Sequence, residues 1–297
     1  MSGNLKQIKR RIKSAKNIGQ ITKAMEMVAA SKMRKAQKKA VQSKPYSDKI
    51  FEATLSLMEK VDPKLHPLLK TPKKDNRPLV VFISTNRGLC GSLNLNLFRR
   101  LSKFIAKRKQ KKTVTFDYAI LGKKGLKFIT NLGGGFYADF SDLVPFTQAV
   151  GPIISAVSRR FLKNRNTSVW LVYNTFINAL KQKPTIKRIL PLTGLKVKPK
   201  KEDQAVDKVR EYLIEPSPNR VIKMLLPFYL ESQVREAVFQ AEASEFSARM
   251  IAMKNATDNA HELVDGLTLE YNKARQRAIT LEIADMVTSK ISMEKND

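Results

Sequence analysis

The sequence predicts an α/β protein in which a long antiparallel two-helix coiled coil, formed by the N- and C-terminal segments, accompanies a central Rossmann-like α/β domain. Three observations support this fold class. No proline occurs before Pro45 or after Pro227, so nothing breaks a helix at either end. Apolar residues recur every three or four positions in both end segments, and short apolar strand-like runs alternate with helical patterns between them.

The N-terminal segment, residues 1–60, is predicted to be one helix of the coiled coil that begins near Leu5. Apolar side chains recur at helical spacing and define one face of this helix. The predicted seam of this helix includes Ile8, Ile12, Ile21 and Val28. A sequence Ser-Lys-Pro ending at Pro45 predicts a kink, because proline removes a helical hydrogen bond.

The middle segment, residues 78–215, is predicted to be the α/β domain. A proline-rich linker precedes it, and its β-branched apolar runs are typical of buried strands in a largely parallel sheet. Strands are predicted over 79–83, 114–121, 169–173 and 186–192, and helices over 95–108, 123–131 and 147–162. A loop is predicted over 133–135.

The C-terminal segment, residues 221–297, is predicted to be the second coiled-coil helix, running from Pro227 to about Lys290. Its small and apolar residues have a mean spacing near 3.6, which predicts one straight seam with little supercoil. That seam consists of Ala256, Ala260, Leu263, Leu267, Tyr271, Ala274 and Ala278.

The charge is strongly positive but unevenly distributed. The chain carries a formal net charge of +30, which by itself is typical of nucleic-acid-binding proteins. Residues 1–60 contain 15 Lys and Arg against 4 Asp and Glu, whereas residues 228–297 contain 8 against 12. The opposite net charges, +11 and −4, favour pairing of the two end helices, although apolar packing must supply most of the stability.

No pattern in the sequence indicates an active site, a metal site or a cofactor. Gly88 and Gly91 follow a predicted strand, but a dinucleotide fingerprint needs a third glycine and an acid about 20 residues later. The single cysteine, Cys90, has no histidine near it in sequence and is interpreted as a structural thiol. His66 and His261 lie far apart, so no zinc site is expected.

Both ends of the chain resemble the γ subunit family of the rotary F-type ATP synthase. The matching stretches are Ile21 to Arg34, Ala248 to Ala260, Tyr271 to Gln276, and Ile279-Thr280. Asn86-Arg-Gly-Leu-Cys-Gly also resembles the loop that follows the first strand in that family, which usually begins with Asp. The resemblance covers the whole length in the same order.

The resemblance implies a non-catalytic rotor subunit of the bacterial type, which transmits torque between the proton-driven c-ring and a ring of three α and three β subunits. Further implied partners are the ε subunit and the membrane surface, on the cytoplasmic side of the bacterial inner membrane. In the family, the residues matching Arg275 and Gln276 contact a loop of β, and the region matching Met25 meets an acidic segment of β.

Departures from the family pattern concern the last residues and the thiols. The family usually ends in a Gly-Ala-rich apolar stretch, whereas this chain has a polar ending from Thr288. Phe246 stands where a histidine or glutamine is more common. With Cys90 as the only cysteine, the two-cysteine switch of the chloroplast type is excluded.

Two other function classes match parts of the sequence. A basic coiled-coil arm that binds nucleic acid would need basic residues on both end helices, but the C-terminal one is net acidic. A nucleotide-using enzyme with a Rossmann-like domain would need the fingerprint that is missing. The sequence therefore favours the rotor and no nucleic-acid partner.

Overall fold

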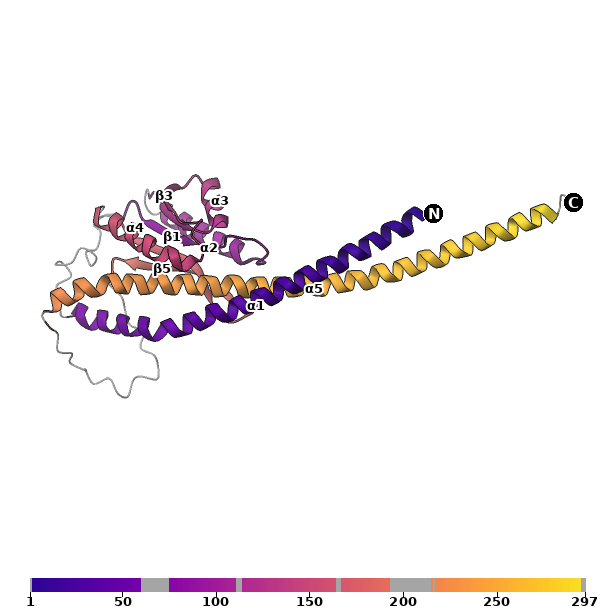
Figure 1. Cartoon of the computed structure of the whole chain (residues 1–297). Helices are drawn as coiled ribbons and strands as arrows, with labels where there is room; N and C mark the ends of the chain where they lie inside the picture. Colours follow the sequence, from indigo (N-terminus) through magenta and orange to yellow (C-terminus); the bar gives the residue numbers. More distant parts are fainter. Residues whose placement is uncertain are drawn as a thin grey trace. The chain divides into compact units, whose positions relative to one another are not determined.

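The computed structural model describes residues 2–59, 75–110, 114–163, 167–192, 215 and 217–294. The two longest helices are α1 (Ser2–Glu59) and α5 (Pro218–Glu294), drawn in indigo to purple and in orange to yellow in Figure 1. The other helices are α2 (Leu93–Lys109), α3 (Lys123–Asn131), the short 3-10 helix η2 (Phe146–Ala149) and α4 (Val150–Lys163). The strands are β1 (Leu79–Ile83), β2 (Asp117–Leu121), β3 (Gly135–Asp139), β4 (Val169–Phe176) and β5 (Gln182–Leu190).

The five strands form one mixed sheet in the order β3-β2-β1-β4-β5. β1 pairs in parallel with β2 and β4, and β2 pairs in parallel with β3. β5 follows β4 through a hairpin and is antiparallel to it. The predicted fold class, long end helices with a central and largely parallel α/β domain, is confirmed.

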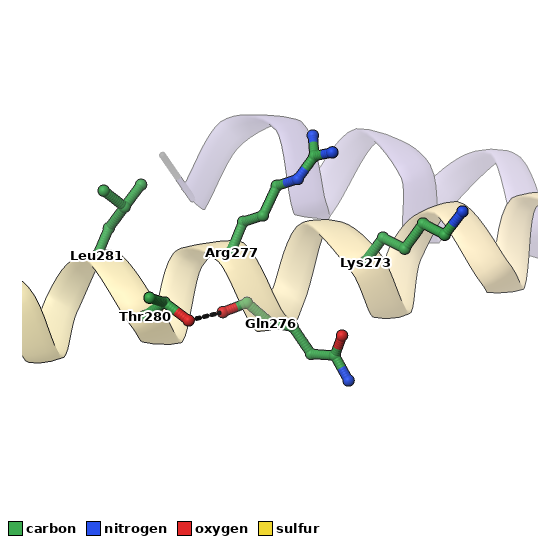
Figure 2. A pocket seen from close by; sticks show the side chains of 5 residues that line it. All are labelled: Lys273, Gln276, Arg277, Thr280 and Leu281. Atoms are coloured by element: carbon green, nitrogen blue, oxygen red, sulfur yellow. Dashed lines mark hydrogen bonds between the residues drawn. The ribbon is translucent and has the colours of Figure 1, made fainter.

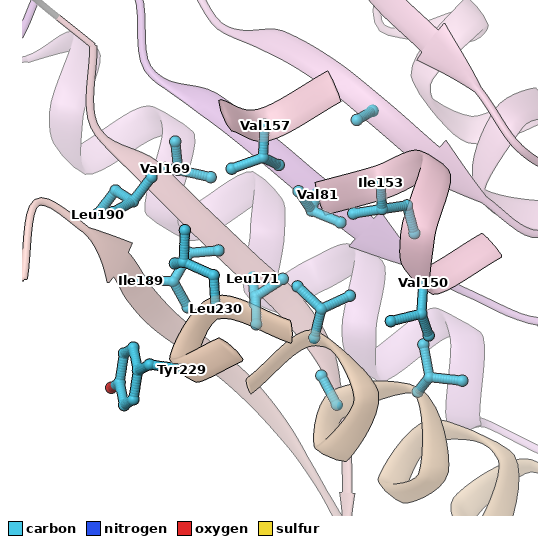
Figure 3. Close-up of a cluster of buried hydrophobic side chains, with 14 of the residues drawn as sticks. Val81, Val150, Ile153, Val157, Val169, Leu171, Ile189, Leu190, Tyr229 and Leu230 are labelled. Carbon is cyan, nitrogen blue, oxygen red and sulfur yellow. The ribbon is translucent and has the colours of Figure 1, made fainter. Parts of the chain in front are cut away.

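The central sheet is covered by helices on both faces, and its middle strand β1 is apolar at every position. All five residues of β1 are buried, which is typical of a parallel strand between two helical layers. Val80 and Phe82 pack with Leu97 and Leu101 of α2 on one face. On the other face, the sheet packs against α4 and the first part of α5. Figure 3 shows this second cluster, with Val81, Val169 and Leu171 from the sheet, Val150, Ile153 and Val157 from α4, and Tyr229 and Leu230 from α5.

Two glycines allow α3 to approach β1 closely. Gly122, at the end of β2, has a φ of 107°, and a Cβ atom there would lie 2.4 Å from the backbone oxygen of Ser84. At Gly125 a Cβ atom would lie 2.5 Å from the Ser84 hydroxyl oxygen, which accepts a hydrogen bond from the Gly125 amide. Side chains at these positions would push the helix away from the sheet.

Several element boundaries differ from those predicted. The bounds of β1 and α3 coincide with the prediction, but β3 begins at Gly135, where only a loop was expected. Helix α5 begins at Pro218, so Pro227 lies inside it rather than at its start. Proline at the first helical position loses no intrahelical hydrogen bond, which explains why Pro218 starts the helix. Helix α1 likewise continues through Pro45.

The chain forms two compact units. The first, which we call the helix-pair unit, consists of residues 1–30 and 249–297, and the second, the sheet unit, consists of residues 31–248. This division differs from the three predicted segments 1–60, 78–215 and 221–297, because the sheet unit contains parts of both long helices. Within the sheet unit, for example, Phe51 of α1 stacks on Tyr229 of α5 with ring centroids 6.0 Å apart.

One stripe of buried and half-buried residues runs along α1 in alternating steps of four and three, with other half-buried residues such as Met25 and Phe51 beside it. The mean spacing of 3.5 is typical of a left-handed coiled coil. The stripe consists of Ile8, Ile12, Ala15, Gly19, Thr22, Glu26, Ala29, Met33, Ala36, Ala40, Ser43, Ser47, Ile50, Thr54 and Leu57. Leu5 also lies half-buried at the start of α1.

The stripe corrects part of the predicted seam of α1. Ile21 and Val28 are 60% and 56% exposed, while the neighbouring Thr22 and Ala29 are buried. The prediction followed the largest apolar side chain at each step, whereas a strict 3.5-residue repeat places Gly19, Thr22 and Ala29 in the seam.

The seam of α5 follows the same repeat. Its members are Met253, Thr257, Ala260, Val264, Leu267, Tyr271, Ala274 and Ala278, all buried or half-buried. Leu263, which was predicted to belong to it, is 55% exposed, and Ala256 is half-buried beside the buried Thr257. The steps alternate between four and three, and their mean from Met253 to Ala278 is near 3.6, as predicted, although the members of the seam differ.

Candidate functional site

The narrowest part of the helix-pair unit lies where Gly19 and Thr22 of α1 face α5. A Cβ atom on Gly19 would lie 3.5 Å from the Cβ atom of Ala260, so the two backbones approach closely. One turn away, the buried hydroxyls of Thr22 and Thr257 are hydrogen-bonded at 2.8 Å. The two contacts agree on one antiparallel register, in which the residue numbers of facing positions add up to 279.

This register places the ends of the pair. The prediction placed Leu5 near residue 279. In the observed register Leu5 lies level with about Ala274, five residues earlier on α5. Beyond Ala278, every α5 side chain from Ile279 to Ser289 is exposed. The predicted unpaired C-terminal stretch therefore corresponds to an exposed stretch of α5.

The residues predicted to contact a partner occupy two separate levels of this unit. Met25 is half-buried and lies level with about Lys254 in the register above. Arg275 and Gln276 are exposed and lie near the N-terminal end of α1. The two levels are separated by 21 positions of α5, which correspond to roughly 30 Å of helix at ~1.5 Å per residue. The structure therefore keeps them apart as two contact points.

Many large apolar side chains lie on the outside of the helix-pair unit, in addition to those in its seam, such as Ile8 and Leu267. Each of the residues named below exposes more than two fifths of its surface, which is unusual for so many large apolar side chains on one small unit. They are Ile18, Ile21, Met27 and Val28 on α1, and Leu263, Leu269, Ile279, Leu281, Ile283, Met286 and Val287 on α5. This surface is the principal candidate for contact with other proteins.

A shallow depression lies on the exposed side of α5 near its C-terminal end. Lys273, Gln276, Arg277, Thr280 and Leu281 line it. Figure 2 shows Lys273, Arg277 and Leu281 pointing to the same side of the helix, with Gln276 pointing away from them. The Thr280 hydroxyl donates a hydrogen bond to the backbone oxygen of Gln276 at 3.0 Å. Threonine side chains in helices commonly bond to the carbonyl four residues earlier in this way.

The loop after β1, residues 86–91, is closed by its own hydrogen bonds. The Thr85 hydroxyl donates to the Arg87 backbone oxygen at 2.7 Å, and the Asn94 amide donates to the Thr85 hydroxyl at 2.7 Å and to Cys90 Sγ at 3.4 Å. Cys90 is buried. These contacts support the interpretation of its glycines as turn residues and of Cys90 as a structural thiol.

Within the sheet unit, α5 contacts β4 and the β4–β5 turn partly through polar side chains. These residues were not identified from the sequence. Gln240 accepts a hydrogen bond from the Phe176 amide at 3.0 Å, and Ser244 donates to the Asn174 backbone oxygen at 3.0 Å. Ser247 donates to the Ala179 backbone oxygen at 2.6 Å. These bonds attach α5 to the end of β4 and to the β4–β5 turn.

Neither a metal site nor a membrane-spanning helix occurs in the part of the chain that the structure describes. Within those residues, no group of three His, Cys, Asp or Glu side chains gathers in a way that could hold a metal ion. None of the described helices carries an apolar stretch of the length needed to cross a bilayer.

Comparisons with known proteins assign the chain to a family. The model of the family described as ATP synthase matches residues 4–292. The ATP synthase gamma chain of Roseiflexus castenholzii is 39% identical over 287 residues, which cover 95% of this chain and 96% of that protein. The gamma chain of Methylacidiphilum infernorum is 38% identical over 299 residues, with 97% and 98% covered.

Solved structures agree on the fold. A chain of the Euglena gracilis mitochondrial ATP synthase, in a structure of OSCP, F1 and the c-ring, matches with a TM-score of 0.65 and 20% identity, covering 99% of this chain and 95% of that chain. A chain of the Tetrahymena thermophila mitochondrial central stalk and c-ring matches with a TM-score of 0.56 and 24% identity, covering 80% and 99%. Because the family model matches residues 4–292 and gamma chains are similar over nearly the full length, this chain belongs to the ATP synthase gamma chain family.

Proposed function

We propose that this chain is the central-stalk rotor subunit of an F-type ATP synthase, which transmits torque between the c-ring and the catalytic ring of α and β subunits. The observation that carries the proposal is the number of large apolar side chains that the helix-pair unit leaves exposed. Its seam contains small residues such as Ala15, Gly19 and Ala29, whereas Ile18, Ile21 and Val28 are exposed. A helix pair with this pattern suits a shaft that other subunits surround.

Within this proposal the chain is a non-catalytic subunit of an enzyme complex. Its partners are the α and β subunits around the helix-pair unit, with the ε subunit and the c-ring. The complex lies at the cytoplasmic side of a bacterial inner membrane, and this chain is peripheral to it. Two observations support this assignment. The similar relatives are ATP synthase gamma chains, and a chain of a central stalk and c-ring shares the fold.

The contact points on the rotor follow from the same assignment. Arg275 and Gln276 are proposed to contact a loop of β, because both side chains are exposed on the outer surface of α5. Met25, half-buried beside the seam, is proposed to lie against an acidic segment of β. A guanidinium can make a forked bond to a carboxylate worth about 1.5–3 kcal/mol, which favours one orientation without locking it.

The proposal is tested by purifying the complex through a tag on this chain. We expect mass analysis to identify α, β, ε and c subunits in the eluate, and reconstituted membranes to synthesise ATP when a proton gradient is applied. Recovery of the chain without α and β subunits, under conditions in which those subunits assemble with other partners, would overturn the rotor assignment.

A variant of Arg275 tests the proposed contact with β independently of the assembly of the complex. We expect Arg275→Ala to assemble normally but to slow proton-driven ATP synthesis by roughly tenfold, the effect of about 1.4 kcal/mol. The exposed Lys13 of α1, away from both proposed contact levels, provides a control, and Lys13→Ala should retain the full rate. Undiminished synthesis in Arg275→Ala would remove Arg275 from the contact and leave the rotor assignment in place.

A further inference from the structure

Two cations flank the depression near the end of α5, on the side of the helix away from Arg275, while Gln276 lines the edge of the depression. Lys273 and Arg277 are exposed and one turn apart, and both point to the same side of α5 in Figure 2. At ~100° per residue, Arg275 lies roughly 160° around the helix from Arg277. A single partner loop cannot therefore bind Arg275 and the Lys273–Arg277 pair from one direction.

The pair is electrostatically unfavourable in the free chain. Like charges four residues apart destabilise a helix by a few tenths of a kcal/mol. Among the residues whose side chains the structure describes, neither Lys273 nor Arg277 forms a salt bridge. Glu270, one turn before Lys273, is the nearest carboxylate along this side of α5, and it does not bridge the gap to Arg277.

The partner helix adds positive charge and cannot supply the missing carboxylate. In the register of the pair, Arg277 lies level with the first residues of α1, where the helix dipole is positive. Residues 2–30 of α1 contain seven Lys and Arg and one acid, Glu26, which forms a salt bridge with Lys23 at 3.1 Å. Before Glu26 the described part of α1 has only basic and uncharged side chains.

We propose that Lys273 and Arg277 form a second acid-binding face of the rotor, which receives an Asp- or Glu-bearing segment of a surrounding subunit in the depression above Thr280 and Leu281. The inference rests on the proposed function and adds a contact to it. A carboxylate between the two cations relieves their repulsion and binds the exposed guanidinium in a forked geometry. The C-terminal part of α5 is then held by acidic groups on two opposite sides, through Arg275 and through this face.

Photo-crosslinking in the assembled complex identifies the occupant. Leu281 lines the depression and is apolar, so a benzoylphenylalanine at Leu281 leaves both cations in place. The same photoprobe at Met286, which is 66% exposed and lies on the opposite side of α5, is the positional control. We expect the adduct from position 281 to contain a peptide of another subunit with Asp or Glu, and the adduct from position 286 to contain a different peptide.

Charge reversal tests whether the cations recruit that peptide. Exposed ion pairs are worth ~0.2–1 kcal/mol each, so we expect Arg277→Glu to lower the yield of the acidic adduct by about two- to fivefold. Arg277→Lys should preserve the yield, and Lys254→Glu, on the same helix but outside the depression, should leave it unchanged.

The outcomes separate this inference from the proposed function. If the complex assembles and synthesises ATP, but position 281 gives no adduct or a peptide without carboxylates, the face does not bind an acidic segment and the inference fails alone. A yield that Arg277→Glu leaves unchanged has the same meaning. If the wild-type chain does not assemble with α and β subunits, the proposed function and this inference fail together.

Discussion

The helix-pair unit leaves many more of its large apolar side chains exposed than the core of the sheet unit does. In the sheet unit, large apolar side chains such as Phe82, Leu97 and Leu171 are fully buried between helices and strands. In the helix-pair unit, alanine, glycine and threonine alternate in the seam with a few large residues such as Ile8 and Leu267, while many other large apolar side chains are exposed. The sheet unit also exposes single apolar residues, Leu180 among them, but both faces of its sheet are covered.

The difference shows where each unit obtains its stability. Burial of apolar area contributes about 25 cal/mol per Å², so a sheet with two apolar faces between helices has a core of its own. A seam of small residues buries little area but lets two helices approach closely, as Gly19 and Ala260 do. Under the proposed function, surrounding subunits would bury the apolar surface that the helix-pair unit leaves exposed.

The largest effect is expected in the core of the sheet unit. Leu171→Ala should lower the free energy of unfolding by about 2–5 kcal/mol, because it removes buried methyl groups and leaves a cavity. Ile21→Ala, at a position 60% exposed on the helix-pair unit, should change it by less than ~0.5 kcal/mol in the isolated chain. Urea unfolding of both variants makes the comparison, and equal losses would contradict the difference between the units.

The same exposed position should matter when partners are present. Ile21→Asp places a charge on the apolar outside of the helix pair, where a surrounding subunit would have to desolvate it. We expect association with α and β subunits to weaken by about tenfold, the equivalent of 1.4 kcal/mol. Co-purification at a series of subunit concentrations measures the affinity. Lys16→Asp, at an exposed position that is already charged, is the control. Normal association of Ile21→Asp would show that this surface is not covered.

The hydroxyl pair in the seam should contribute a measurable coupling. Thr22→Val removes one partner of the buried bond between Thr22 and Thr257, at a cost of about 0.5–1.5 kcal/mol. The double variant with Thr257→Val should cost less than the sum of the single variants, since neither hydroxyl is then left without its partner. Hydrogen exchange of the α5 amides around Thr257 reports the local stability, and strictly additive losses would argue against a coupled pair.

A modest stabilisation is expected at Gly19. An added Cβ would lie 3.5 Å from that of Ala260, which is ordinary van der Waals contact, and alanine is favoured over glycine inside helices by about 1 kcal/mol. Gly19→Ala should therefore stabilise the helix pair by ~0.5–1 kcal/mol. Gly125→Ala is the matched contrast in the sheet unit, because its Cβ would lie 2.5 Å from Ser84 Oγ, and it should destabilise. Destabilisation by Gly19→Ala would mean that the helices pack more tightly than the structure shows.

The smallest effect is a pH dependence within the sheet unit. Burial, followed by the negative charge of Glu245, raises the pKa of Glu242, and Lys39 and the Phe146 amide oppose the rise. The native state then holds a proton that the unfolded chain releases, so this carboxyl stabilises the fold below its ordinary pKa of 4.5 and loses that contribution as the pH rises through the raised pKa.

Glu242→Gln should remove this part of the pH dependence. Urea unfolding of the variant and of the wild type between about pH 4 and pH 8 measures the difference in slope. Parallel curves would show that Lys39 and the Phe146 amide fully compensate for burial.

Local patterns were sufficient for the elements whose stability depends on residues close in sequence. The five apolar residues of β1 and the segment of α3 between Gly122 and Gly133 carry their own start and stop signals, and their bounds were predicted. The two long helices followed from apolar periodicity and from the scarcity of proline. The motifs at 21–34 and 248–260 were sufficient to suggest the family.

Tertiary contacts decided the rest. β3 is mostly exposed and not strongly apolar, and it is a strand because its backbone pairs with β2. The seam of the coiled coil could not be read from apolar size, because close approach at Gly19 and the Thr22–Thr257 bond select small and polar residues over Ile21 and Val28. A strict count of four and three from Ile8 would have found that register. Its physical basis, that two helices supercoil to keep one narrow stripe in contact, becomes visible only when both helices are in place.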